Sequence, residues 1–184
     1  MFYRIVNDQI QLHLTHPHQT EELFALTDRN REFLKQWLPW LDKVQGPEDS
    51  RHFLKEQLQK YAEGTLLTVL IYYEGKIAGV MGFHQIGQSN RTAEIGYWLG
   101  EEYNGRGIIT ACVRELIKIG QEYLKLQKII IRCATDNARS RAVPLRLGFE
   151  LEGTFRRAEN LHGRWIDINV FGLLLEENSH EPSD

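Results

Sequence analysis

Two hydrophobic periods alternate along this chain and divide it into predicted strands and helices. Residues 9–14 (QIQLHL) alternate apolar and polar positions, which predicts a first strand. The apolar positions that follow have helical spacing and predict two short helices ending near Pro39, then a third from about Pro47 to Tyr61. Pro47 and the acidic residues that follow it suit the first turn of that third helix, where the positive end of the helix dipole lies.

After the third helix the period falls to two, which predicts a run of strands. Residues 65–73 and 76–87 join in a hairpin at Glu74-Gly75, and residues 92–99 add another strand beside them. We expect these three strands to pair antiparallel.

A long amphipathic helix and a closing hairpin are predicted in the second half of the chain. The helix spans Arg106 to about Leu124 and leads into a strand over residues 128–134, whose consecutive isoleucines suit coverage on both faces. The remaining elements are a short helix over residues 139–147 and a hairpin of strands 149–157 and 164–175 turned at His162-Gly163. The pattern predicts one mixed α/β (α+β) domain over residues 1–175, and we expect the acidic tail over 176–184 to be disordered.

The composition restricts the partners of the chain. Its 184 residues, 42% of them hydrophobic, suffice for one core, and a formal charge of −3 gives no field that favours nucleic acid or a membrane surface. Cys112 and Cys133 lack CxxC spacing and are expected to be free buried thiols; with no signal-peptide pattern, we expect a cytoplasmic protein. The longest uncharged apolar run is about half of the roughly 20 residues of a membrane-spanning helix, and the histidines show no metal-ligand spacing.

The turn Asn104-Gly105-Arg106-Gly107 stands directly before the long helix. A helix N-terminus presents backbone N–H groups without intrahelical partners, together with the positive end of the dipole, and so forms an anion site. The two glycines remove the Cβ atoms that would hold a phosphate away. The turn therefore predicts a phosphate site, with a plain chain reversal as the alternative.

Two familiar phosphate loops do not fit this turn. A P-loop requires Gly-Lys-Ser/Thr, but Gly107 is followed by Ile108-Ile109, so no lysine reaches a γ-phosphate. A dinucleotide fingerprint requires a third glycine, but Thr110 occupies that place, and no acidic residue ends a strand about 20 positions later. The pyrophosphate of coenzyme A is the third candidate.

The order of elements and several motifs resemble the GNAT superfamily of N-acetyltransferases. That superfamily binds the acetyl-CoA pyrophosphate on a Gln/Arg-x-x-Gly-x-Gly/Ala loop and carries a later Asn…Leu-Gly-Phe motif, which matches Asn137 to Phe149 here. The segments NREFLKQWLPW, EIGYWL and AENLHG are similar to the ribosomal-protein-serine (RimL-type) branch. The resemblance spans nearly the whole chain and implies a mixed, mostly antiparallel sheet of six or seven strands flanked by about four helices.

The resemblance also implies acetyl-CoA as the co-substrate, no metal, and a cofactor site at the glycine turn. By position, the cofactor-binding residues are Trp98, Leu99, Asn104, Gly105, Arg106, Gly107, Ile108, Ile109, Thr110 and Asn137. Asn104 departs from the Gln or Arg of the superfamily loop, and Ile109 stands where a small residue is usual. Pro144 occupies the place of a tyrosine that, in many members, is thought to protonate the departing thiolate.

Acetyl transfer to an amine needs a base, and two carboxylates are candidates. Glu159 precedes the hairpin turn in what we expect to be a loop, a setting that favours a functional role, and it is the preferred base. Glu94 lies on the strand that leads to the glycine turn, beside the expected pantetheine arm. A salt bridge to Arg156 or Arg157 is the alternative for Glu159, and a surface or cross-strand charge is the alternative for Glu94.

The leaving thiolate and the oxyanion need hydrogen-bond donors. Ser140, near the start of the short helix, is the candidate acid, with helix N-capping as its alternative role. Asn137 is assigned to coenzyme binding through its amide, with turn formation as the alternative. A backbone N–H at Trp98 or Leu99 is expected to meet the oxyanion if the sheet opens there.

Basic and aromatic side chains complete the expected site. Arg106 is expected to add positive charge near the phosphates. The guanidinium groups of Arg139 and Arg141 would suit the oxygens of the 3′-phosphate, but exposed arginines are commonly only solvated, so Arg106 alone is assigned to the site. Trp37 and Trp40 either wall an acceptor pocket or belong to the core.

Three functions follow from the sequence. The leading one is direct transfer of acetyl from acetyl-CoA to the N-terminal α-amine of a protein, with a ribosomal protein as the preferred acceptor, without a covalent enzyme intermediate. A small amine, such as a polyamine, amino acid or antibiotic, is the second acceptor class, and a non-catalytic acyl-CoA-binding module is the third function. The exposed edges of the closing hairpin add an expectation of self-association into a homo-oligomer.

Overall fold

The described part of the chain forms eight strands and five α-helices. The strands are β1 (Tyr3–Ile5), β2 (Ile10–Leu14), β3 (Leu67–Tyr73), β4 (Lys76–Gly87), β5 (Thr92–Leu99), β6 (Lys128–Ala134), β7 (Glu150–Leu161) and β8 (Arg164–Leu174). The α-helices are α1 (Thr20–Arg29), α2 (Arg31–Lys35), α3 (Pro47–Ala62), α4 (Ile108–Glu122) and α5 (Ala138–Arg146), joined by 3-10 turns η1 (Pro17–Gln19), η2 (Leu41–Lys43) and η3 (Glu101–Tyr103).

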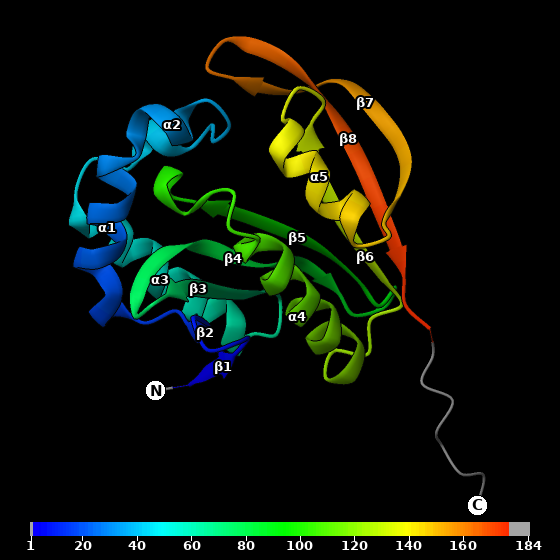
Figure 1. Cartoon of the computed structure of the whole chain (residues 1–184), viewed down its shortest axis with the longest axis horizontal. Helices are drawn as coiled ribbons and strands as arrows, with labels where there is room; N and C mark the ends of the chain where they lie inside the picture. Colours follow the sequence, from blue (N-terminus) through cyan, green and yellow to red (C-terminus); the bar gives the residue numbers. More distant parts are fainter. Residues whose placement is uncertain (1, 177–184) are drawn as a thin grey trace, which may run out of the picture.

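The eight strands form one sheet with helices on both faces (Figure 1). The computed structural model describes residues 2–176, so all but the first residue of the acidic tail predicted over residues 176–184 lies outside the described residues. The strand order is β1-β2-β3-β4-β5-β6-β8-β7, and every neighbouring pair is antiparallel except β5 and β6. The mixed, mostly antiparallel sheet predicted from the sequence is confirmed.

The predicted element counts need small corrections. The described part of the chain has eight strands where six or seven were expected, and five α-helices where about four were expected. The missed strand is β1, which pairs with β2 at the sheet edge and is too short to show a two-residue period. β7 continues to Leu161, four residues past the predicted end at Arg157. The register shift between Phe155 and Glu159 interrupts the alternation of apolar and polar residues, so the sequence pattern did not reveal this last part of the strand. Glu159 therefore lies in a strand, and the predicted loop setting is wrong.

Different helices cover the two faces of the sheet. One hydrophobic cluster packs Cys112 and Leu116 of α4 against Ile95 and Ile131 of the central strands. A second cluster packs α1 and α3 against the opposite face, through side chains such as Leu54. Figure 1 shows α4 in front of the sheet and α3 behind it.

The sheet divides between β5 and β6, and this division positions the site. The parallel ladder between the two strands stops at Ile95↔Ile131. β5 continues to Leu99 along β4, whereas β6 continues to Ala134 along β8. The strands therefore separate into a wedge, so the opening on which the expected oxyanion donor depends is present.

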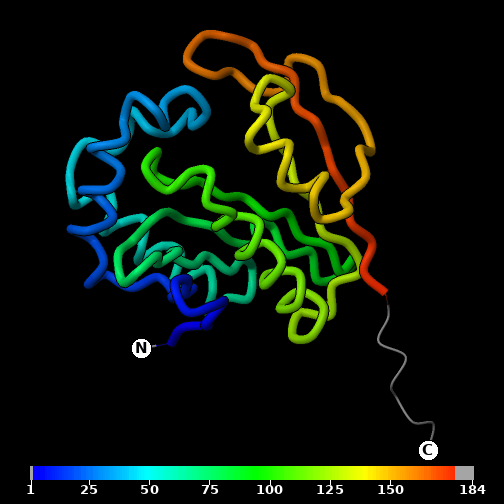
Figure 2. The backbone as a smooth tube through the Cα atoms, in the orientation of Figure 1, coloured from blue at the N-terminus to red at the C-terminus, as the bar shows by residue number. Residues whose placement is uncertain are grey.

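A ring of contacts surrounds the open end of this wedge. The Nε2 atom of His162, at the tip of the β7–β8 hairpin, lies 3.2 Å from the carbonyl oxygen of Leu38, which follows α2. Across the ring, the N–H of Glu101 donates to Oδ1 of Asn30 at 2.8 Å, which ties the start of α2 to the end of β5. The tube in Figure 2 shows α2 and the hairpin tip at the same end of the molecule.

Candidate active site

A cavity of about 640 Å³ lies where α2, β5, α4 and α5 meet. Cavities that bind small ligands have volumes in this range. Phe33, Leu34, Trp37 and Leu38 form its α2 side. Of the cofactor-binding residues expected from the sequence, Trp98, Leu99, Asn104, Gly105, Gly107, Ile108, Ile109, Thr110 and Asn137 all line this cavity, as does Ser140.

The glycine turn forms the N-terminus of α4 at one end of the cavity. Gly105 and Gly107 have φ of 76° and 73°, the left-handed region that side chains rarely adopt. Within the described residues no side chain caps α4, and its first turn carries no acidic residue, so the N–H groups of Ile108 and Ile109 have no capping partner. The cavity therefore meets an uncapped, positive helix end.

Three arginines on the cavity wall surround this helix end. Arg114, Arg139 and Arg146 line the cavity from α4 and α5. Arg146 donates to Oγ1 of Thr110 at 3.1 Å, and the Arg139 guanidinium lies 5.7 Å from the ring centre of Phe33. Sequence reasoning missed Arg114 and Arg146, because only the packing of α5 beside α4 brings them to one wall. Their charge suits a ligand with several phosphates.

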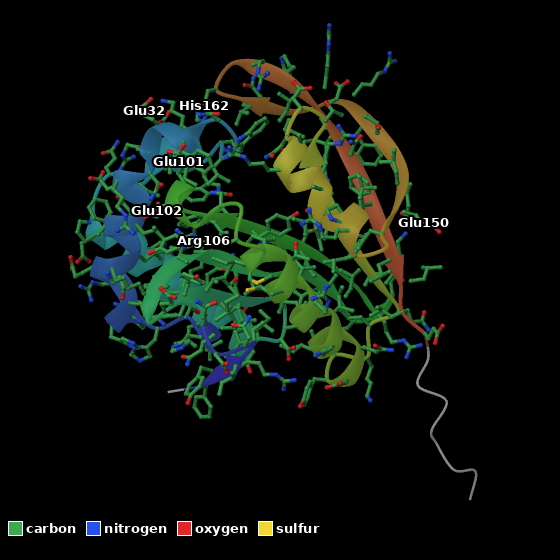
Figure 3. All side chains as sticks on the ribbon, viewed as in Figure 1. Glu32, Glu101, Glu102, Arg106, Glu150 and His162 are labelled. Atoms are coloured by element: carbon green, nitrogen blue, oxygen red, sulfur yellow. The ribbon has the colours of Figure 1, made fainter. Side chains whose placement is uncertain are left out.

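The other two candidate arginines point elsewhere. Figure 3 labels Arg106 and Glu102. The Arg106 guanidinium lies 5.6 Å from the ring centre of Tyr73, its Nε donates to the carbonyl of Glu102, and the residue is not part of the cavity lining. Arg141 donates to the carbonyl of Thr135 at 3.1 Å. Of the two candidates for the 3′-phosphate, Arg139 is the one that lines the cavity.

Ser140 lies in the wedge with its backbone and side chain both hydrogen-bonded. Asn137 is the N-cap of α5, and its Oδ1 accepts the N–H of Ser140 at 3.0 Å. The N-capping alternative for Ser140 is therefore wrong, since its hydroxyl donates instead to the phenol oxygen of Tyr97 at 3.3 Å. The Tyr97 hydroxyl in turn donates to the carbonyl oxygen of Ser140 at 3.0 Å.

Sequence reasoning missed Tyr97. Its position two residues from Ile95 puts it on the α4 face of β5, where a phenol places a polar atom inside an apolar layer. Burial raises the pKa of the Tyr97 phenol, so the hydroxyl stays protonated. The two-residue period of EIGYWL could have placed Tyr97 on the α4 face of β5. It could not have shown that the hydroxyl of Tyr97 meets Ser140, because that contact depends on the wedge.

Backbone donors also face the wedge. The N–H of Gly100 donates to the carbonyl of Ala78 on β4 at 2.9 Å. Backbone groups alternate between the two sides of a strand, so the N–H of Trp98 also faces β4, whereas that of Leu99 faces the wedge. This geometry favours Leu99 over Trp98 as the donor to an oxyanion.

Two carboxylates share one arginine on the opposite face of the sheet. Glu94 neighbours Ile95 in β5 and so points away from α4, and it pairs across the ladder with His84. An oxygen of Glu159 lies 4.0 Å from the Arg132 guanidinium, which is the ion pair that forms in place of the expected alternatives. Neither carboxylate lines the cavity on the α4 side. The carboxylates and Ser140 thus lie on opposite faces of the sheet, with the wedge between them.

Burial controls the electrostatics of Glu94. Its pKa is raised by desolvation, lowered by the Arg132 cation and raised further by the nearby Glu159 carboxylate. Glu94 is half-buried and lies opposite His84, so its position matches the cross-strand form of the alternative given for it.

Glu94→Gln is expected to stabilise the fold at neutral and alkaline pH. The folded pKa is raised above the unfolded value, so the ionised side chain destabilises the wild type once the pH exceeds about 4 to 5. Urea unfolding of both proteins from pH 4 to 8 should show a stability difference that is smallest at pH 4 and grows with pH. A difference that shrinks over this range would contradict the expectation.

Two kinds of site have no support within residues 2–176. No group of three or more His, Cys, Asp or Glu side chains in this range is placed to hold a metal ion. No helix in the described part of the chain has the length and apolar character needed to cross a membrane.

Comparison with known sequences identifies the family. Residues 10–150 match the acetyltransferase (GNAT) domain. The chain is 33% identical over 171 residues to the ribosomal-protein-serine acetyltransferase of Escherichia coli (strain K12), with 93% of this chain and 96% of that protein covered. It is 35% identical over 178 residues to the putative ribosomal N-acetyltransferase YdaF of Bacillus subtilis (strain 168), with 96% and 97% covered.

Solved structures share the fold over the same length. The microcin C7 self-immunity acetyltransferase MccE, in complex with acetyl-CoA and AMP, superposes with a TM-score of 0.89 at 35% identity, covering 92% of this chain and 94% of that one. The ribosomal α-N-protein acetyltransferase RimL, in complex with coenzyme A, gives 0.91 at 29% identity, covering 95% and 98%. The family predicted from the glycine turn and the later motifs is confirmed, and the chain belongs to the GNAT family of N-acetyltransferases.

Proposed function

We propose that this protein transfers the acetyl group of acetyl-CoA to the N-terminal α-amine of a ribosomal protein. The observation that carries the proposal is the uncapped N-terminus of α4, where Gly105 and Gly107 open onto a cavity that leads into the wedge. The acceptor rests on the relatives of 33% and 35% identity, both of which are named for ribosomal acetylation. A ribosomal acceptor would also place the enzyme in the cytoplasm.

The donor would bind from the α4 side. The pyrophosphate meets the N–H groups at the start of α4, and Arg114, Arg139 and Arg146 offset its charge together with that of the 3′-phosphate. The pantetheine arm then follows the wedge between β5 and β6, with the thioester carbonyl at the free N–H of Leu99.

The acceptor amine would approach from the face that carries the carboxylates. An α-amine has an ordinary pKa near 8, so a carboxylate acting directly or through water suffices as base, and Glu159 is that base in our proposal. The neutral amine attacks the thioester carbon, the C–S bond breaks, and the thiolate leaves toward the hydroxyl of Ser140. No covalent enzyme intermediate is needed.

A small amine with an aromatic group is the second candidate acceptor. The rings of Trp40 and Trp98 lie with centroids 6.3 Å apart, and Trp98 and Trp37 line the cavity. Such rings suit stacking against a base or an aromatic side chain. The relative MccE, solved with acetyl-CoA and AMP, supports this class.

One acceptor panel tests both candidates. Peptides with the N-terminal sequences of ribosomal proteins, the same peptides with a blocked N-terminus, polyamines, amino acids and aminoacyl-nucleotide analogues are each mixed with acetyl-CoA. Release of the CoA thiol and the mass of one added acetyl group are measured. We expect turnover with free-N-terminus peptides and none with blocked ones. Turnover on small amines alone would replace the ribosomal acceptor, and binding of acetyl-CoA without any turnover would indicate a non-catalytic module.

Gly107→Ala is expected to raise the KM for acetyl-CoA several-fold. A side chain at φ 73° is strained by about 1–2 kcal/mol, so the turn relaxes and moves the N–H groups of α4. Gly64→Ala is the matched control, because Gly64 has φ of 71° at the end of α3, outside the cavity lining. Both variants should lose similar stability, and a KM that rises equally in both would contradict a role for the turn in binding.

A further inference from the structure

We propose that Tyr97 is a positioning residue of the transfer reaction, whose phenol holds the hydroxyl of Ser140 where the thiolate leaves. This inference rests on the proposed acetyl transfer, although not on which amine accepts the acetyl group. Tyr97 and Ser140 both line the cavity, and they reach it from opposite walls of the wedge, on β5 and α5.

Three hydrogen bonds join Ser140 to Asn137 and Tyr97, and its side chain also interacts with the buried thiol of Cys133. Its N–H donates to Asn137 Oδ1, its carbonyl oxygen accepts from the Tyr97 hydroxyl, and its own hydroxyl donates to the Tyr97 oxygen. A phenol has one proton, and this one is given to the carbonyl, so the phenol oxygen is left as an acceptor for the serine hydroxyl. Tyr97 thereby restrains both the main chain and the side-chain rotamer of Ser140.

Pro144 explains why the carbonyl of Ser140 is free to accept from Tyr97. In an α-helix this carbonyl would accept from the N–H four residues later, and that residue is Pro144, which has no N–H. A half-buried carbonyl without a partner loses part of its hydration, and the phenol of Tyr97 replaces the missing helical donor. The proline at a position where a tyrosine was expected from the family resemblance thus creates the acceptor that binds a tyrosine from β5.

The arrangement suits a leaving thiolate. Because burial keeps the Tyr97 phenol neutral, it does not take the proton of Ser140. As charge develops on the sulfur, rotation about the Cβ–Oγ bond turns the serine hydroxyl from the phenol oxygen to the sulfur. The phenol holds Ser140 in place, while Ser140 supplies the donor that contacts the reacting atoms.

Tyr97→Phe separates this role from simple packing, because it keeps the ring and removes only the hydroxyl. We expect kcat to fall roughly tenfold, with the KM values for acetyl-CoA and acceptor changed by less than about twofold. In a Ser140→Ala background the same substitution should lower kcat by less than about twofold, since the two residues act through one hydroxyl. An unchanged kcat in Tyr97→Phe, or an equal loss in both backgrounds, would overturn the proposal.

Pro144→Ala tests the link to the helix. It restores an N–H that competes with Tyr97 for the Ser140 carbonyl, so kcat should fall in the wild-type background and change little in Tyr97→Phe. Pro47→Ala, in the first turn of α3, is the matched proline control and should leave kcat unchanged. A Pro144→Ala enzyme that is more thermostable and fully active would show that the phenol only fills a vacant hydrogen bond.

The readout is CoA thiol release with whichever acceptor the panel identifies. If no amine is acetylated, the proposed function fails. The Tyr97 comparison then uses hydrolysis of acetyl-CoA by water, in which the same thiolate departs. Failure of the proposed function and failure of the proposed role of Tyr97 are therefore distinguishable.

Discussion

Glu159→Gln is expected to lower kcat by roughly 10²- to 10³-fold and to flatten the acidic limb of the pH–rate profile. A general base must be ionised to accept the proton of the amine, and glutamine keeps the shape of the side chain without accepting it. The Arg132–Glu159 pair, at 4.0 Å, is partly exposed, so its loss should change stability by less than about 1 kcal/mol. The measurement is kcat and kcat/KM from pH 5 to 9 with the acceptor found by the panel.

Glu152→Gln is the matched control for this prediction. Glu152 lies on the same strand and also pairs with a cation, Lys128 at 2.7 Å, but it is outside the wedge. Its kcat should equal that of the wild type. If Glu159→Gln keeps the wild-type pH profile while Glu94→Gln loses the acidic limb, Glu94 is the base. If both keep it, water accepts the proton.

Phe83→Ala is expected to cost about 3–5 kcal/mol of folding free energy. The ring is fully buried on β4, and a Cβ built on Gly120 of α4 would lie 3.2 Å from its Cζ, so the helix backbone rests almost directly on it. For a domain of this size the loss corresponds to a fall in Tm of roughly 10 °C.

Calorimetry and urea unfolding measure this effect. Phe2→Ala is the control, because Phe2 is 85% exposed and should change stability by less than about 0.5 kcal/mol. A Phe83→Ala protein with wild-type Tm would mean that α4 does not depend on this ring.

Features carried by neighbouring residues were predictable from the sequence. The turn Asn104 to Gly107 and the helix that follows it are local features. The glycine spacing indicates that a ligand can approach the backbone closely, wherever the turn lies in the fold. The strand over residues 128–134 was also predictable, because its consecutive isoleucines are local; its parallel pairing with β5 was not predicted.

Features that join distant residues were not predictable in the same way. The link between Tyr97 and Ser140 spans 43 positions and exists only because the ladder stops at Ile95. The partner of Glu159 was sought among adjacent arginines, but the strand register brings Arg132 from β6 instead. The end of the β5–β6 ladder decides the first link and the register of β6, β8 and β7 decides the second, and both depend on tertiary packing.

The contact between His162 and Leu38 has a consequence for the shape of the acceptor. With the Asn30–Glu101 bond it completes a closed loop that runs through β5, α2, the hairpin, β8 and β6. A polymer passes through a closed loop most readily by its end, since an internal segment must enter doubled on itself. If the acceptor enters through this loop, as our proposal requires, the free end of an extended polypeptide suits it best, whichever side chain follows the amine.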